Sequence, residues 1–224
     1  CAFRKSHRPS PFFSAPPSTS IRSTVHSRSF YHARKFRRLL TGHEGHSNFL
    51  NEPVRIARSI ADIGGGFTKS LLLDKGYKAG ISLNDIALID GGLSGRIVAV
   101  NRDSARLLLI SDVESRIPVI IEPEKIQAIL IGDGTDRPQL RYIEKRFSMS
   151  KDARIITTGN GGVFPPGVPV GVPIVNSWPK DSKGVAKEKM IVDDHVNLRV
   201  LPFAQADVSA YFKIIKNQQI NPPE

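Results

Sequence analysis

From residue 55 onward, the sequence consists of short apolar runs separated by turn-forming residues. Runs of about four to seven apolar residues are separated by Gly, Asp, Asn or Pro roughly every eight to fifteen positions, which is the spacing of strands and turns. Gly or Asn also stands where a hairpin needs positive φ, as in Asp90-Gly91-Gly92 and Gly159-Asn160-Gly161. The pattern therefore predicts an all-β chain. Strands are expected at Lys69–Leu73, Ile86–Asp90, Arg96–Val100, Arg106–Ile110, Ile117–Ile121, Ile126–Ile131, Gln139–Ile143, Arg154–Thr158, Val168–Ile174 and Val196–Leu201.

Very little of the sequence has a helical pattern. Short helical pieces are expected only around Val113–Ser115 and at Asp207–Lys216, where a loose apolar stripe follows Asp207 as a candidate N-cap. Many short strands with so few helices are typical of barrels or a sandwich.

The first 50 residues differ from the rest in charge and texture. They hold nine Lys and Arg and a single acid, which is +8 of the formal net charge of +11. Their Ser, Pro, Arg and His show neither strand nor helix periodicity, so we expect residues 1–53 to be a disordered basic segment and residues 217–224 to be a flexible C-terminus. A nucleic-acid-binding arm, a membrane-surface patch, a transit peptide and a solvated, non-native terminus are all compatible with this composition.

Composition excludes several classes of site. The single cysteine, Cys1, excludes an internal disulfide, and only one histidine, His195, follows residue 46, which argues against a structural zinc site. No stretch approaches the roughly 18 apolar residues that span a bilayer. We expect no cofactor and no metal.

A catalytic centre finds little support. His195, beside Asp193 and Asp194, is the only candidate base after residue 46 for a trypsin-like hydrolase. No Gly-x-Ser-x-Gly elbow occurs, and Ser94 is the nearest approach. The glycine-rich segments lack the Lys-Ser/Thr ending of a P-loop. No calcium-loop spacing links the carboxylates Asp112, Glu114, Glu122 and Glu124, and Glu122-Pro123-Glu124-Lys125 is typical of a solvated loop between two strands.

Three blocks of the sequence, in order, resemble the rod shape-determining protein MreC family. They are Lys69–Val100, SARLLLISDVESRIPVII at Ser104–Ile121, and RIITTGNGGVFPPGVPVGV at Arg154–Val172. Val200–Ile215 is similar to the closing segment of the family, so the resemblance covers about residues 55–212.

The sequence departs from the family at several places. Asp85 stands where the family favours Gly, Ser94 where it favours Val, and Thr158 where it favours Ser. Residues 1–53 show neither the transmembrane helix nor the coiled coil that precede the barrels in the family.

The resemblance implies two small six-stranded β-barrels in a chymotrypsin-like arrangement without a working triad, intertwined over residues 54–216. It implies a non-catalytic scaffold of the bacterial cell-wall elongation machinery, at the periplasmic face of the inner membrane. The implied partners are further copies of the chain, a class B penicillin-binding transpeptidase, MreD, RodA and MreB, with no nucleic acid. A hydrolase using His195 and a nucleic-acid binder acting through the basic tail remain the alternatives.

Two corners carry specific expectations. Arg106 and Arg116 bracket the acids that follow the Arg106–Ile110 strand, which predicts an ion pair across that turn. Phe164-Pro165-Pro166 can end a β-ladder but not lie inside one, so we expect an inter-domain corner with Phe164 as its core plug. Alternatively, Phe164, Pro165 and Pro166 are partner-binding residues, since aromatic anchors dominate many interfaces. Trp178 is expected in a surface loop.

Overall fold

The computed structural model describes residues 54–65, 68–143, 146–175, 189–193, 198–204, 206 and 210–217. All of them belong to one compact unit, residues 43–224. The basic segment 1–53, the Trp178 loop and His195 lie outside the described residues.

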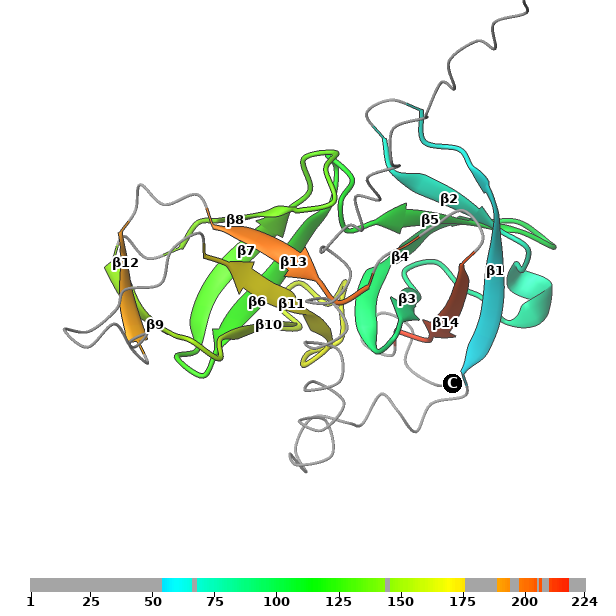
Figure 1. Cartoon of the computed structure of the whole chain (residues 1–224). Coiled ribbons are helices and arrows are strands. Elements are labelled where there is room, and N and C mark those ends of the chain that lie inside the picture. Colours follow the sequence, from blue (N-terminus) through cyan, green and yellow to red (C-terminus); the bar gives the residue numbers. More distant parts are fainter. Residues whose placement is uncertain are drawn as a thin grey trace, which may run out of the picture. The chain divides into compact units, whose positions relative to one another are not determined.

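The first barrel is closed by six strands in the order β1-β14-β3-β4-β5-β2 (Figure 1). Along each strand, successive side chains point alternately into the interior of the barrel and outward from its wall. Ala57, Leu107 and Phe212 are among the buried side chains of the interior. The strands are β1 (Arg55–Asp62), β2 (Ser70–Leu73), β3 (Ile86–Ile89), β4 (Gly92–Val100), β5 (Ala105–Leu109) and β14 (Tyr211–Ile215).

The second barrel is closed by six strands in the order β10-β11-β13-β8-β7-β6. The chain passes from the first barrel into the second and returns through β14, so the two barrels are intertwined in sequence. The strands are β6 (Arg116–Glu122), β7 (Ile126–Ile131), β8 (Gln139–Arg141), β10 (Arg154–Thr157), β11 (Pro169–Ile174) and β13 (Arg199–Pro202); β9 (Arg146–Ser150) and β12 (Lys189–Asp193) form a separate two-stranded sheet.

The expected all-β fold with two six-stranded barrels is confirmed, and each expected strand overlaps an observed one. The helix expected at Asp207–Lys216 is wrong. Residues Tyr211–Ile215 form β14, which pairs with β1 and β3 and points Phe212 and Ile214 into the first barrel. The helical piece expected around Val113–Ser115 is also wrong, because these residues form a turn between β5 and β6.

The corner between β5 and β6 is fixed by a buried carboxylate rather than by the expected ion pair. Asp112 accepts the backbone N–H of Lys69 through Oδ2 (2.5 Å) and that of Glu114 through Oδ1 (2.7 Å). Arg116 donates to the carbonyls of Val113 and Ser115 instead of to a carboxylate. Backbone donors satisfy both carboxylate oxygens, so the turn holds without a cation.

Candidate functional site: the junction between the barrels

The two barrels share one buried apolar cluster. Ile86, Leu88 and Leu93 of the first barrel belong to the same cluster as Val170 and Phe164 of the second-barrel region. Strand β3 contributes because it is apolar on both faces: Ala87 lies in the interior of the first barrel, and its two neighbours belong to the shared cluster. Ile215, which pairs with Ile86, completes this contribution from β14.

A polar pair, here called the junction latch, links the first barrel to a loop of the second. It consists of Asp85 and Asn217, both fully buried. Asp85 accepts the backbone N–H of Asn217 at 3.3 Å. The side-chain Nδ2 of Asn217 donates to the carbonyls of Gly162 (2.9 Å) and Val163 (2.8 Å). One asparagine, two residues after the end of β14, therefore holds the loop that carries Phe164.

The carboxyl group of Asp85 has a perturbed pKa. Burial raises it above its ordinary value. Hydrogen bonds from the backbone N–H groups of Ser82 and Asn217, and the positive charges of Arg55 and Lys216, oppose this rise without cancelling it. The latch therefore contains a carboxylate that favours its protonated form more than a solvated one does.

Thr157, the last residue of β10, holds the glycine-rich loop 159–167 through hydrogen bonds. Its hydroxyl donates to the carbonyl of Pro165 and accepts the N–H of Val168, and its carbonyl accepts the N–H of Gly167 at 2.8 Å. Gly159 has a φ of +82°, a conformation that side chains disfavour, and a Cβ there would lie 3.0 Å from Pro166. These contacts fix the loop in one shape.

The three predicted partner-binding residues, Phe164, Pro165 and Pro166, differ in their exposure to solvent. Phe164 is 3% exposed and belongs to the shared cluster, which confirms its predicted role as a core plug. Its ring is therefore not presented to solvent, while Pro165 is half-buried and Pro166 is exposed. A partner-binding role for Phe164, Pro165 and Pro166 stays a prediction.

The candidate base of the hydrolase alternative, His195, lies outside the described residues, as do its neighbour Asp194 and Trp178. Over the described ranges, no group of three or more His, Cys, Asp and Glu side chains is placed to hold a metal ion. Nor does that part of the chain contain a helix long and apolar enough to cross a membrane.

Sequence reasoning missed both residues of the latch. The one signal in the sequence is that Asp85 stands where the family favours glycine. Asn217 was assigned to the flexible C-terminus, which the structure corrects: its backbone and side-chain amides are both engaged in buried hydrogen bonds. Nothing in the local sequence separates Asn217 from a solvated asparagine.

The sequence and the fold are both similar to those of known proteins. The family described as "Rod shape-determining protein MreC, barrel core" matches residues 60–203. A cell shape-determining protein MreC of Caulobacter vibrioides is 39% identical over 122 residues, which are 54% of this chain and 35% of the relative. Its counterpart in Cereibacter sphaeroides is 41% identical over 113 residues, 50% of this chain and 37% of the relative. The crystal structure of MreC from Pseudomonas aeruginosa superposes with a TM-score of 0.61 at 26% identity, covering 74% of this chain and all of that one.

Proposed function

Because the chain belongs to the MreC family, whose barrel core matches residues 60–203, we propose that it is a non-catalytic scaffold in bacterial cell-shape determination. The observation that carries the proposal is the pair of closed barrels held together by the shared cluster and the junction latch. The matched segment is about a third of the length of the curated relatives, so the activity of the whole protein is inferred from its barrel core.

The polar groups of the described residues support a structural rather than a catalytic role. Asp85 and Asp112, both fully buried, accept backbone N–H groups, and Glu122 forms an ion pair with Arg154 at 2.6 Å. These carboxylates hold turns and strands in place. A catalytic acid or base needs instead a free face toward a substrate and a pocket that encloses it.

The proposed partners are further copies of the chain and a class B penicillin-binding transpeptidase, followed by MreD, RodA and MreB. Sheet edges offer one means of contact. Both barrels are closed, but β9 and β12 pair only with each other among the described strands, so each has one edge without a described partner. Ile191 on β12 is 57% exposed beside that edge. An added strand from a partner is the contact this sheet favours.

The proposed location is the periplasmic face of the bacterial inner membrane. It follows from the family and from the proposed partners, whose work is the assembly of the cell wall.

Binding to the purified periplasmic domain of a class B penicillin-binding protein tests the proposal. The whole chain, immobilised, should bind this domain saturably, and at the same concentrations it should hydrolyse neither peptide nor ester substrates. Hydrolysis that His195→Ala abolishes would replace the scaffold by the hydrolase alternative. Salt-sensitive binding to an oligonucleotide that disappears on deletion of residues 1–50, with no transpeptidase binding, would favour the nucleic-acid alternative.

A further inference from the structure

The outer wall of the first barrel exposes several large apolar side chains. Ile56 and Ile60 on β1 are 51% and 46% exposed, and Tyr211 on β14 is 65% exposed. The strand register places Arg58 opposite Tyr211 and Ile56 opposite Lys213, so apolar and cationic side chains alternate over both strands. These five residues form what is here called the β1–β14 face. Exposed apolar groups gathered in this way mark interaction surfaces.

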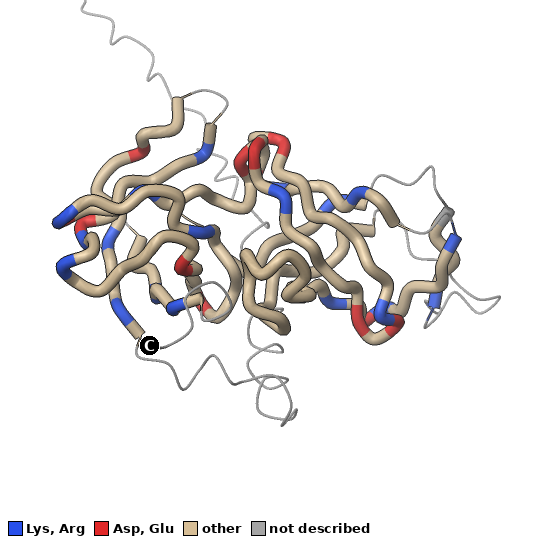
Figure 2. The backbone as a smooth tube through the Cα atoms, turned by 180° about the vertical axis from the view of Figure 1, so that it is seen from behind, with Lys and Arg blue, Asp and Glu red and all other residues tan. Residues whose placement is uncertain are grey.

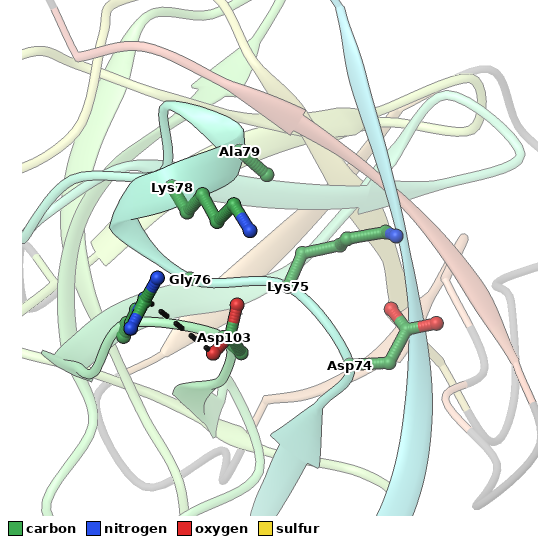
Figure 3. A pocket seen from close by; sticks show the side chains of 7 residues that line it. Asp74, Lys75, Gly76, Lys78, Ala79 and Asp103 are labelled. Atoms are coloured by element: carbon green, nitrogen blue, oxygen red, sulfur yellow. Dashed lines mark ion pairs between the residues drawn. The ribbon is translucent and has the colours of Figure 1, made fainter.

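A basic pocket of about 300 Å³ borders this face. The backbone N–H of Arg58 on β1 donates to Asp74 in the pocket wall at 2.8 Å. Lys75 and Lys78 have no carboxylate partner within the described residues, and Figure 3 shows both side chains at the pocket. The other residues that line the pocket are Gly76, Ala79, Arg102 and Asp103.

The pocket keeps a cationic character despite its two acids. Its three cations, Lys75, Lys78 and Arg102, outnumber Asp74 and Asp103. The Arg102–Asp103 pair is 4.0 Å long and both side chains are largely exposed, so water screens it strongly. The two lysines therefore remain available to an anion.

Charge distinguishes the first barrel from the second (Figure 2). Residues 54–110 and 210–217 hold ten Lys and Arg against five Asp and Glu, and one of those acids, Asp85, is buried. The described residues of 111–204 hold nine basic and eight acidic residues. A cationic surface with apolar side chains attracts an anionic partner. It does not attract residues 1–50 of the same chain, which carry +8.

We propose that the β1–β14 face and the adjoining basic pocket dock the first barrel onto an anionic phospholipid bilayer. The outer wall of a closed barrel is convex and cannot enclose a peptide, but it can press protruding side chains into a planar interface. Tyrosine and isoleucine lie well at the boundary between headgroups and acyl chains, while Lys and Arg attract anionic headgroups. The pocket between Lys75, Lys78 and Arg102 suits a headgroup phosphate. This docking is independent of the proposed scaffold role, since it needs no protein partner.

Co-sedimentation of the whole chain with vesicles tests the proposal, using phosphatidylcholine with and without phosphatidylglycerol. Ile56→Ser combined with Ile60→Ser alters the β1–β14 face, and the matched control is Val113→Ser combined with Tyr142→Ser, two exposed side chains outside the first barrel. All variants keep the basic residues 1–50, so any difference between them comes from the barrels. The face variant should bind vesicles containing phosphatidylglycerol about tenfold more weakly for each isoleucine replaced. The control should bind like the wild type.

A second set of variants tests the pocket. Lys75→Gln, Lys78→Gln and Arg102→Gln together should weaken binding to anionic vesicles by roughly a hundredfold at low salt, since each basic residue near such a surface is worth about fivefold. Lys125→Gln, Arg137→Gln and Lys151→Gln, three exposed cations of the second-barrel region, are the matched control. The pocket effect should shrink with added salt, while the isoleucine effect should persist.

Equal vesicle binding by the altered and control variants would overturn lipid docking. If the face variant then lost binding to polyglutamate, the surface would be one for an acidic protein instead. Thermal unfolding at the wild-type temperature shows that each variant is folded, as expected for exposed positions.

Discussion

Replacing Asn217 by alanine removes the side chain that joins the first barrel to the loop of the second. Its Nδ2 donates to the carbonyls of Gly162 and Val163, at 2.9 and 2.8 Å. Both loop residues are half-buried, so each carbonyl left without a donor costs about 1 kcal/mol, the low end of the range for an unpaired buried group. The backbone N–H that binds Asp85 is retained. The free energy of unfolding should therefore fall by about 2 kcal/mol.

Urea unfolding followed by circular dichroism measures this change, with Asn160→Ala as the matched control. Asn160 lies in the same loop, is the same residue type and is exposed, so its replacement should change the free energy of unfolding by less than about 0.5 kcal/mol. Because the barrels share one apolar cluster, both proteins should unfold in a single transition.

A structural readout separates a general loss of stability from a loosened junction. Spin labels at Tyr77 and Tyr142, both exposed and in different barrels, report the distance between the barrels once Cys1 is replaced by serine. The distance distribution should broaden for Asn217→Ala and stay narrow for Asn160→Ala. Wild-type stability together with an unchanged distribution would refute the latch.

Three further predictions concern the junction and its surroundings. Since burial raises the pKa of Asp85 above 3.8, the folded state holds that proton more tightly than the unfolded chain. The free energy of unfolding of the wild type should thus fall relative to that of Asp85→Asn as the pH rises from 3.8 through the raised pKa. Above that pKa the difference between the two proteins should stay constant. Urea titrations that show a constant difference across the whole range would contradict this. Phe164→Ala should cost about 3–5 kcal/mol by leaving a cavity in the shared cluster, against less than about 0.5 kcal/mol for the exposed Pro166→Ala, as measured by thermal unfolding. A Cβ at Gly132 would lie 1.9 Å from the carbonyl oxygen of Asp112, so Gly132→Ala should lower the free energy of unfolding by about 3 kcal/mol in the same assay. Wild-type stability would mean that the backbone at this corner shifts to accommodate the methyl group.

The fold was predictable because strand periodicity and turn chemistry agree along most of the chain. The main error, a helix at Asp207–Lys216, has a physical cause. The stripe that looked helical contains Tyr211, Ile214 and Ile215, whereas the strand buries Phe212 and Ile214 in alternation. Pairing with β1 and β3, which lie more than a hundred residues earlier, decides between the two. The sequence of a short apolar run does not show whether such a partner strand exists elsewhere in the chain.

The junction was predictable only in its apolar part. Phe164 followed from a sequence that ends a ladder with two prolines and therefore needs a corner. The latch depends on where Asn217 meets Gly162 and Val163, 55 and 54 residues away in the chain. Such a contact is fixed by tertiary structure alone. Asp85 shows the same limit, because its departure from glycine could not reveal that it is buried.

The latch bears on how a non-catalytic protein can act. The surfaces proposed to bind other molecules lie apart: the β1–β14 face is on the first barrel, and the edges of β9 and β12 are in the second-barrel region. Contacts at one surface can orient molecules bound at another only if the barrels keep a fixed relation to each other. A purely apolar junction resists separation but tolerates sliding, because apolar contacts have little directional preference. Hydrogen bonds from Asn217 to two successive carbonyls are directional and therefore favour one orientation of the barrels relative to each other. We therefore expect Asn217→Ala to disturb simultaneous binding of a membrane and a transpeptidase more than binding of either alone.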